Sequence, residues 1–185
     1  AIMRVIPRMI VLSPCDALEA RKATIEAAKT NTPVYIRLAR EKTPIITTDK
    51  TPFEIGKAQT VWESKKPKVG IVATGALLHK ALQVAQDLDG EVSVEVVNLA
   101  TIKPLDEEAV VKLAKKTGCI VTVEEHQVRG GMGSAVAECL AKNHPVPMRF
   151  VGVDDQFGQS GTPDELIEHY GMGKEAIIKA IKSLV

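Results

Sequence analysis

The sequence predicts a layered α/β protein: a three-layer α/β/α domain on a mixed, mostly parallel sheet of five strands, preceded by an incomplete β-α-β unit. Two observations predict this class. Short runs of Val, Ile and Leu alternate along the chain with segments whose apolar residues recur at helical spacing. Apolar residues make up 45% of the chain, yet it has only three Phe, two Tyr and one Trp, so aliphatic side chains must build the core.

The first 48 residues are expected to form the β-α-β unit. The apolar runs Met9–Leu12 and Val34–Leu38 predict two strands. Between them, Asp16 can accept the amide of Glu19 while the Glu19 side chain reaches back, a capping box that starts a helix. The apolar face of this helix is expected at Leu18, Ile25 and Ala28.

Residues 39–55 contain several Thr and Pro residues and no apolar period, which is typical of a linker. We therefore divide the chain into a first domain of residues 1–48 and a second domain of residues 49–185.

The second domain is expected to alternate strands and helices. Its strands are predicted at Gly56–Trp62, Val69–Ala73, Val92–Val97, Cys119–Val123 and Met148–Val153. Helices are predicted to start at Gly75, at Pro104, after the glycine cluster Gly130–Gly133 and at Thr162, with a last one carrying Ile177, Ala180, Ile181 and Leu184 on one face. The connection between the first two strands is too short for a crossover helix, so the first strand is expected to be antiparallel and to lie at an edge.

Composition excludes several classes of function. Lys and Arg total 24 against 23 Asp and Glu, and this net charge of +1 does not provide the basic surface that nucleic-acid binding needs. No apolar run approaches the roughly 18 residues of a membrane span. The three cysteines, Cys15, Cys119 and Cys139, are scattered, which fits a reducing cytoplasm and neither a disulfide framework nor a zinc site.

The strongest local candidate for a site is Glu124-Glu125-His126, at the carboxyl end of a buried strand and just before the glycine cluster. Ligands of α/β sheets bind at such strand ends, and two carboxylates with an imidazole could bind a metal or relay a proton. Alternatively, the glycines only allow the loop to turn tightly, and the acidic residues accept backbone amides. The residues alone favour this second interpretation.

Arg37 and Arg40 follow the second strand of the first domain. Side chains at these two positions of a strand point to opposite faces, but a turn at Ala39 would free Arg40 to enter the cleft beyond the strand. A guanidinium group there suits a phosphate, because its planar fork can donate two hydrogen bonds at once. His79, one step off the apolar stripe of its helix, is expected to be a half-buried flanking residue.

Several segments occur in the order found in one enzyme family. They are Arg4–Met9, Asp16–Lys22, Pro33–Arg40, Val97–Asp106, Val123–His126 with Gly130–Val136, and Gly158–Leu166. Over essentially its whole length the chain resembles the carboxyl-terminal part of the transketolase family of thiamine diphosphate enzymes. Deoxyxylulose-phosphate synthases and the β subunits of 2-oxoacid dehydrogenases share the middle segments but usually end differently.

The resemblance implies a cytoplasmic, homodimeric transferase of the pentose phosphate pathway. It would move a two-carbon ketol unit between a ketose phosphate and an aldose phosphate, using thiamine diphosphate and a divalent metal, Mg or Ca. Residues 1–48 would be the end of the pyrimidine-binding domain, and the cofactor site would lie upstream in an amino-terminal part of the enzyme. This chain alone is then expected to be inactive and to bind no cofactor.

One substrate-binding residue of the family can be assigned to this chain by its position in the sequence. The resemblance assigns Arg40 to the substrate's sugar phosphate, and it gives Glu124, Glu125 and His126 structural or interface roles. No catalytic, cofactor-binding or metal-binding residue is expected in this chain. A role as a dimerisation or regulatory module only stays open as the alternative.

Overall fold

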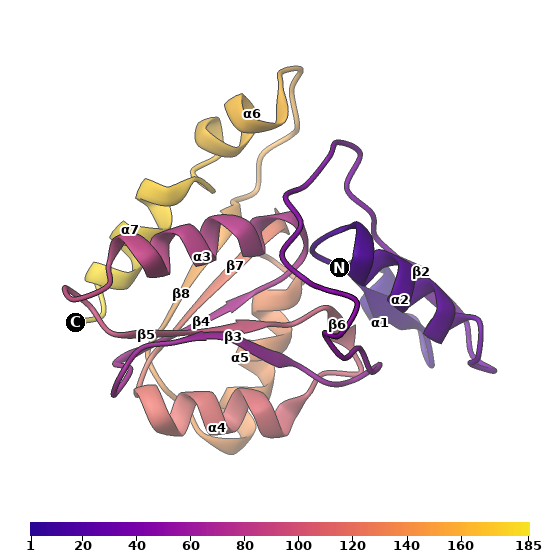
Figure 1. Cartoon of the computed structure of the whole chain (residues 1–185), viewed down its shortest axis with the longest axis horizontal. Coiled ribbons are helices and arrows are strands. Elements are labelled where there is room, and N and C mark those ends of the chain that lie inside the picture. Colours follow the sequence, from indigo (N-terminus) through magenta and orange to yellow (C-terminus); the bar gives the residue numbers. More distant parts are fainter.

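The main sheet has five strands, hydrogen-bonded in the order β3-β5-β4-β7-β8. In the computed structural model, which describes residues 1–185, four of them run parallel and β3 runs antiparallel to its neighbour β5 (Figure 1). The strands are β3 (Gln59–Glu63), β4 (Val69–Ala73), β5 (Val94–Asn98), β7 (Ile120–Gln127) and β8 (Met148–Val153). The predicted mixed sheet, with its first strand antiparallel at an edge, is confirmed. That strand begins at Gln59 rather than Gly56, because Gly56 turns the chain with φ +87°.

Helices cover both faces of this sheet, which confirms the three layers (Figure 1). The helices α3 (Leu78–Asp87) and α7 (Lys174–Lys182) pack on one face, and α4 (Glu107–Thr117) and α5 (Met132–Asn143) pack on the other. A 3-10 turn, η1 (Gly75–Leu77), precedes α3, and α6 (Pro163–His169) follows β8. None of the helices combines the length and the apolar character that crossing a membrane would require.

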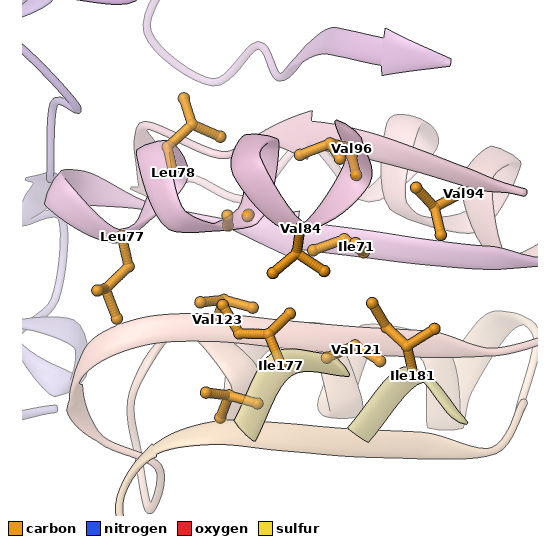
Figure 2. Packing of buried hydrophobic residues seen from close by; sticks show 14 of the residues in the cluster. Ile71, Leu77, Leu78, Val84, Val94, Val96, Val121, Val123, Ile177 and Ile181 are labelled. Carbon is orange, nitrogen blue, oxygen red and sulfur yellow. The ribbon is translucent and has the colours of Figure 1, made fainter. Parts of the chain in front are cut away.

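The core consists of aliphatic side chains from both strands and helices. Val84, Ile177 and Ile181 reach from α3 and α7 toward Ile71 and Val121 of the strands, and all five are fully buried (Figure 2). Burying each such side chain contributes about 1.5–3 kcal/mol. On the opposite face, a Cβ atom on Gly70 would lie 2.7 Å from Leu113 Cγ. The glycine thus allows α4 to pack closely against β4.

A second, smaller sheet contains a strand that the sequence did not predict. In it β1 (Ile10–Leu12) pairs in parallel with β2 (Val34–Ile36) and antiparallel with β6 (Thr101–Lys103). Because β6 follows β5 in the chain, a segment of the second domain completes one edge of the first. The short helices α1 (Ile2–Val5) and α2 (Ala17–Ala27) accompany this sheet, and no helix or strand lies between Ile36 and Gln59. The division at residue 48 stays a prediction.

Residues 13–19, which we call the junction, connect this small sheet to the main one. The Ser13 amide donates to the Ala100 carbonyl over 2.8 Å, and the Ser13 carbonyl accepts the Gly75 amide over 3.1 Å. Ser13 is buried. The chain leaving β1 is therefore bonded directly to the segments that follow β4 and β5.

Asp16 attaches the linker to the junction. Its carboxylate accepts the amides of Glu19, Ile46 and Thr47 at 2.8, 2.8 and 2.6 Å, and also the Thr47 hydroxyl. Burial acts to raise the pKa of Asp16, but these donors outweigh it, so the pKa lies below its ordinary value. The predicted helix start at Asp16 is confirmed.

Glu19, in the first domain, is hydrogen-bonded to a residue of the second. It is buried, and its carboxylate accepts the Cys15 amide at 2.7 Å and the side-chain amide of Asn98, at the end of β5, also at 2.7 Å. The predicted capping box is therefore only half correct, because Glu19 bonds to Cys15 instead of reaching back to Asp16. Burial raises the pKa of Glu19, although its hydrogen bonds to Cys15 and Asn98 act in the opposite sense.

Of the predicted apolar face of α2, Leu18 is half-buried and the other two positions are wrong. Glu19 and Ala23 are its buried residues, whereas Ile25 is 50% exposed and Ala28 is also exposed. The physical reason is that α2 is turned so that Glu19 enters the junction, and this places Ile25 toward solvent.

Exposed apolar side chains are concentrated in the first 48 residues. They are Ile2, Val5, Ile25, Tyr35, Leu38 and Ile45. The outer edge of β2 also has no neighbouring strand within the chain. Exposed apolar patches and open strand edges mark surfaces that bind another chain.

We therefore predict that the 19.9 kDa chain forms a homodimer or a larger assembly. Sedimentation across micromolar concentrations should give a species heavier than the monomer. Replacing Val5 and Ile25 together by Lys should shift the population toward monomer, because two charges would have to be buried in the contact. Phe157→Lys is the control, since Phe157 is 99% exposed but lies in the second domain. A clean monomer for the wild-type chain would contradict the prediction.

Candidate functional site

A groove of about 770 Å³ lies where the linker, α3 and α6 come together. Three segments far apart in the sequence supply most of its lining: residues 39–44, the residues around the start of α3 and the residues around the start of α6. Its lining residues are Ala39, Arg40, Glu41, Lys42, Thr43, Pro44, Ala76, Leu77, His79, Lys80, Glu125, Gly161, Thr162, Pro163, Asp164, Leu166, Ile167 and Met172.

Arg40 lies in this groove, while Arg37 is used elsewhere. The Arg37 amide continues the sheet by donating to the Leu12 carbonyl, and its guanidinium lies 3.7 Å from Glu125. The chain bends at Arg40, which is exposed and forms no hydrogen bond or ion pair within residues 1–185. The structure thus places the guanidinium of Arg37 near Glu125 and leaves that of Arg40 available to a ligand.

Two further basic residues enter the groove from α3. Lys80 pairs with Asp164 at 3.3 Å, and only 23% of its side chain is exposed. His79 is half-buried, as expected, and its pKa lies below the ordinary value because of burial and then because of the charge on Lys80. Sequence reasoning gave Lys80 no role. Nothing in the local pattern marks it, because Lys80 and Arg40 come to line one groove only in the folded chain.

A second cavity, of about 430 Å³, lies at the carboxyl ends of β4 and β7. The chain passes from β4 to β5 on one side and then to β7 on the other, so the strand order reverses here. Ligands of open α/β sheets bind at such a point. Thr74, Glu124 and His126 line this cavity together with Arg37 and other residues of the first domain.

Glu124 is bonded to the start of α5. Its two carboxylate oxygens accept the amides of Met132 and Gly133 at 2.7 and 2.8 Å, and the side chain is buried. A Cβ atom on Gly131 or Gly133 would crowd this carboxylate, so the glycines allow the close approach. The interpretation that Glu124 accepts backbone amides is confirmed. Burial raises its pKa, and the two amides offset part of this effect.

Glu125 and His126 face other partners. Glu125 approaches Arg37, and His126 Nδ1 lies 2.7 Å from the Gln127 carbonyl. Within residues 1–185, no three His, Cys, Asp or Glu side chains are arranged to hold a metal ion. His126 Nδ1 also lies 3.9 Å from Glu124 Oε2 in the same cavity, whereas Glu125 approaches Arg37, so the three consecutive residues do not all converge on one point.

Comparison with known proteins agrees with this architecture. The sequence profile of the family "Transketolase, C-terminal domain" matches residues 56–177. The chain belongs to this transketolase family. A solved structure titled "Split gene transketolase, inactive beta4 tetramer" superposes with a TM-score of 0.93 at 42% identity, over 98% of this chain and 59% of the other.

Two relatives show how much of a longer protein this chain spans. The 6-deoxy-6-sulfo-D-fructose transketolase subunit SqwH of Clostridium sp. (strain MSTE9) is 44% identical, over 97% of this chain and 56% of that protein. One subunit of the apulose-4-phosphate transketolase of Phocaeicola vulgatus is 36% identical, over 100% of this chain and 59% of that protein. The chain thus covers less than two thirds of each relative.

The raised pKa of Glu124 predicts a pH-dependent contribution to stability. A carboxyl group that holds its proton more tightly when folded contributes stability that is complete below its ordinary pKa of 4.5 and is lost as the pH rises through the folded value. The stability advantage of the wild type over Glu124→Gln should therefore shrink as the pH rises above 4.5. Denaturant unfolding of both proteins from about pH 4 to about pH 8 measures this difference. An advantage that grows with pH would contradict it.

Proposed function

We propose that the chain is the carboxyl-terminal part of a transketolase that moves a two-carbon ketol unit from a ketose phosphate to an aldose phosphate. The family membership supports the reaction class, and the names of two relatives, each a transketolase subunit, support a role as one part of a larger enzyme. We also propose a cytoplasmic location and a place in the pentose phosphate pathway. The three unpaired, buried cysteines fit a reducing compartment.

We propose that thiamine diphosphate and a divalent metal, Mg or Ca, act in the complete enzyme and are held by an amino-terminal part that works with residues 1–185. The residues of this chain do not fit the metal-diphosphate group. The one buried carboxylate at the strand end, Glu124, already accepts two amides, and no metal-ligand set is assembled. We therefore assign this chain substrate binding and assembly, and no step of the cofactor's chemistry.

The observation that carries the proposal is the free guanidinium of Arg40 in the groove. A substrate phosphate needs several hydrogen-bond donors, and Arg40 can give two in parallel without breaking a contact of its own. The linker after β2 holds Arg40 just beyond the strand, and residues around the start of α3 line the same groove. Arg40 would bind and orient the phosphorylated end of the sugar.

Arg40→Ala in the complete enzyme tests this role. The change removes charge-assisted hydrogen bonds worth about 1.5–3 kcal/mol each, so the KM of a phosphorylated donor should rise about tenfold or more. The value of kcat should change little if the contact is equally strong in the ground and transition states. Arg40→Lys should restore only part of the affinity, because an ammonium keeps the charge but not the fork.

An unphosphorylated donor provides the decisive comparison, and Arg21→Ala provides the matched control. Arg21 is an exposed arginine on α2 whose partner, Asp49, lies at the surface. An equal effect of Arg40→Ala on phosphorylated and unphosphorylated donors would show that Arg40 does not bind the phosphate. If the complete wild-type protein transfers no ketol unit at all, the assembly-only role, which the exposed apolar residues of the first domain favour, replaces this proposal.

A further inference from the structure

Lys80 is a largely covered cation whose charge is poorly compensated. Only 23% of its side chain is exposed, and its one partner, Asp164, is 86% exposed. An ion pair with such an exposed carboxylate contributes little, because water screens it. The ammonium group is thus held in the groove by α3 with capacity for a stronger anionic partner.

The remaining charges of the groove leave an excess of free cations. Of its three acidic residues, Glu125 approaches Arg37 and Asp164 approaches Lys80, which leaves Glu41. Of the basic residues, Arg40 and Lys42 form no ion pair. These two come from the linker, whereas Lys80 and His79 come from α3, so positive groups lie on both walls of the groove.

We propose that Lys80, with His79 beside it, is a second contact for the phosphate that Arg40 binds, so that one phosphate bridges the linker and α3. This inference rests on the proposed function of Arg40 and adds a binding residue from the second domain. The phosphate oxygens can accept donors from both walls, with Arg40 as the planar fork and Lys80 as the point charge. On binding, Lys80 exchanges the exposed Asp164 for the phosphate.

The bridge has a consequence for specificity. A phosphorylated ligand would hold residues 39–44 against α3, whereas the same sugar without its phosphate would make neither contact. Asp164 would act as a competitor for Lys80. Removing its charge should therefore strengthen binding.

Inorganic phosphate, titrated into the 185-residue chain at constant ionic strength, tests the inference. The imidazole NMR signals of His79 report on the groove, and His144, at the end of α5, serves as an internal reference. We expect Arg40→Ala and Lys80→Gln each to weaken phosphate binding about tenfold. Asp164→Asn should tighten it. Lys112→Gln, which removes an exposed charge from α4, should leave it unchanged.

The outcomes separate this inference from the proposed function. If Arg40→Ala weakens binding and Lys80→Gln does not, the bridge is overturned while the role of Arg40 stands. If the wild type shows no response of His79, or if Arg40→Ala has no effect, both fail. An equal loss in Lys112→Gln would reveal non-specific charge attraction and would also overturn the bridge. If Asp164→Asn binds phosphate as the wild type does, or more weakly, the proposed contact between Lys80 and the phosphate is overturned.

A kinetic measurement in the complete enzyme provides the second readout. Lys80→Gln should raise the KM of a phosphorylated donor about tenfold and leave that of an unphosphorylated donor unchanged. Thermal melting checks folding, since losing the pair with the exposed Asp164 should leave the melting temperature of the variant nearly unchanged. A variant that melts like the wild type and binds both donors like the wild type overturns the inference.

Discussion

The hydrogen bond from Asn98 to Glu19 is the contact on which the relation between the two sheets depends. It joins the end of β5 in the main sheet to α2 of the first domain, and both side chains are buried. Ser13 and Asp16 extend the same junction to Ala100, Gly75 and the linker. A buried polar group without its partner costs about 1–3 kcal/mol, so these bonds favour one arrangement of the domains over others.

The junction also determines the geometry of the groove. Asp16 holds Ile46 and Thr47, a few residues beyond the segment that carries Arg40, while Ser13 is bonded to the turn that begins α3. The two walls of the groove are therefore fixed to a common set of residues. This arrangement explains how an arginine of the first domain and a lysine of the second can face the same space, although neither domain contains the groove by itself.

The sequence predicted those features that local physical chemistry determines. The buried strands of the main sheet, the edge position of β3 and the buried residues Ile177 and Ile181 followed from apolar spacing and connection length. Features that depend on long-range packing were missed. The strand β6 has only three residues and no pattern of its own. Helix α2 buries Glu19 rather than Ile25 because Glu19 bonds to Asn98, and this partner could not be predicted because it is distant in the sequence. The phosphate role of Arg40 came from resemblance, and Lys80 became a candidate only through its position in space.

Native-state hydrogen exchange of Asn98→Ala tests most directly the claim that the junction holds the domains together. The substitution leaves the buried Glu19 carboxylate without its side-chain donor. The amides of β1, β2 and α2 should therefore exchange faster than in the wild type, while those of β4 and β7 keep their protection. Asn143→Ala is the control, because Asn143 donates only within α5. Unchanged exchange in β1, β2 and α2, or an equal increase in both domains, would contradict the account.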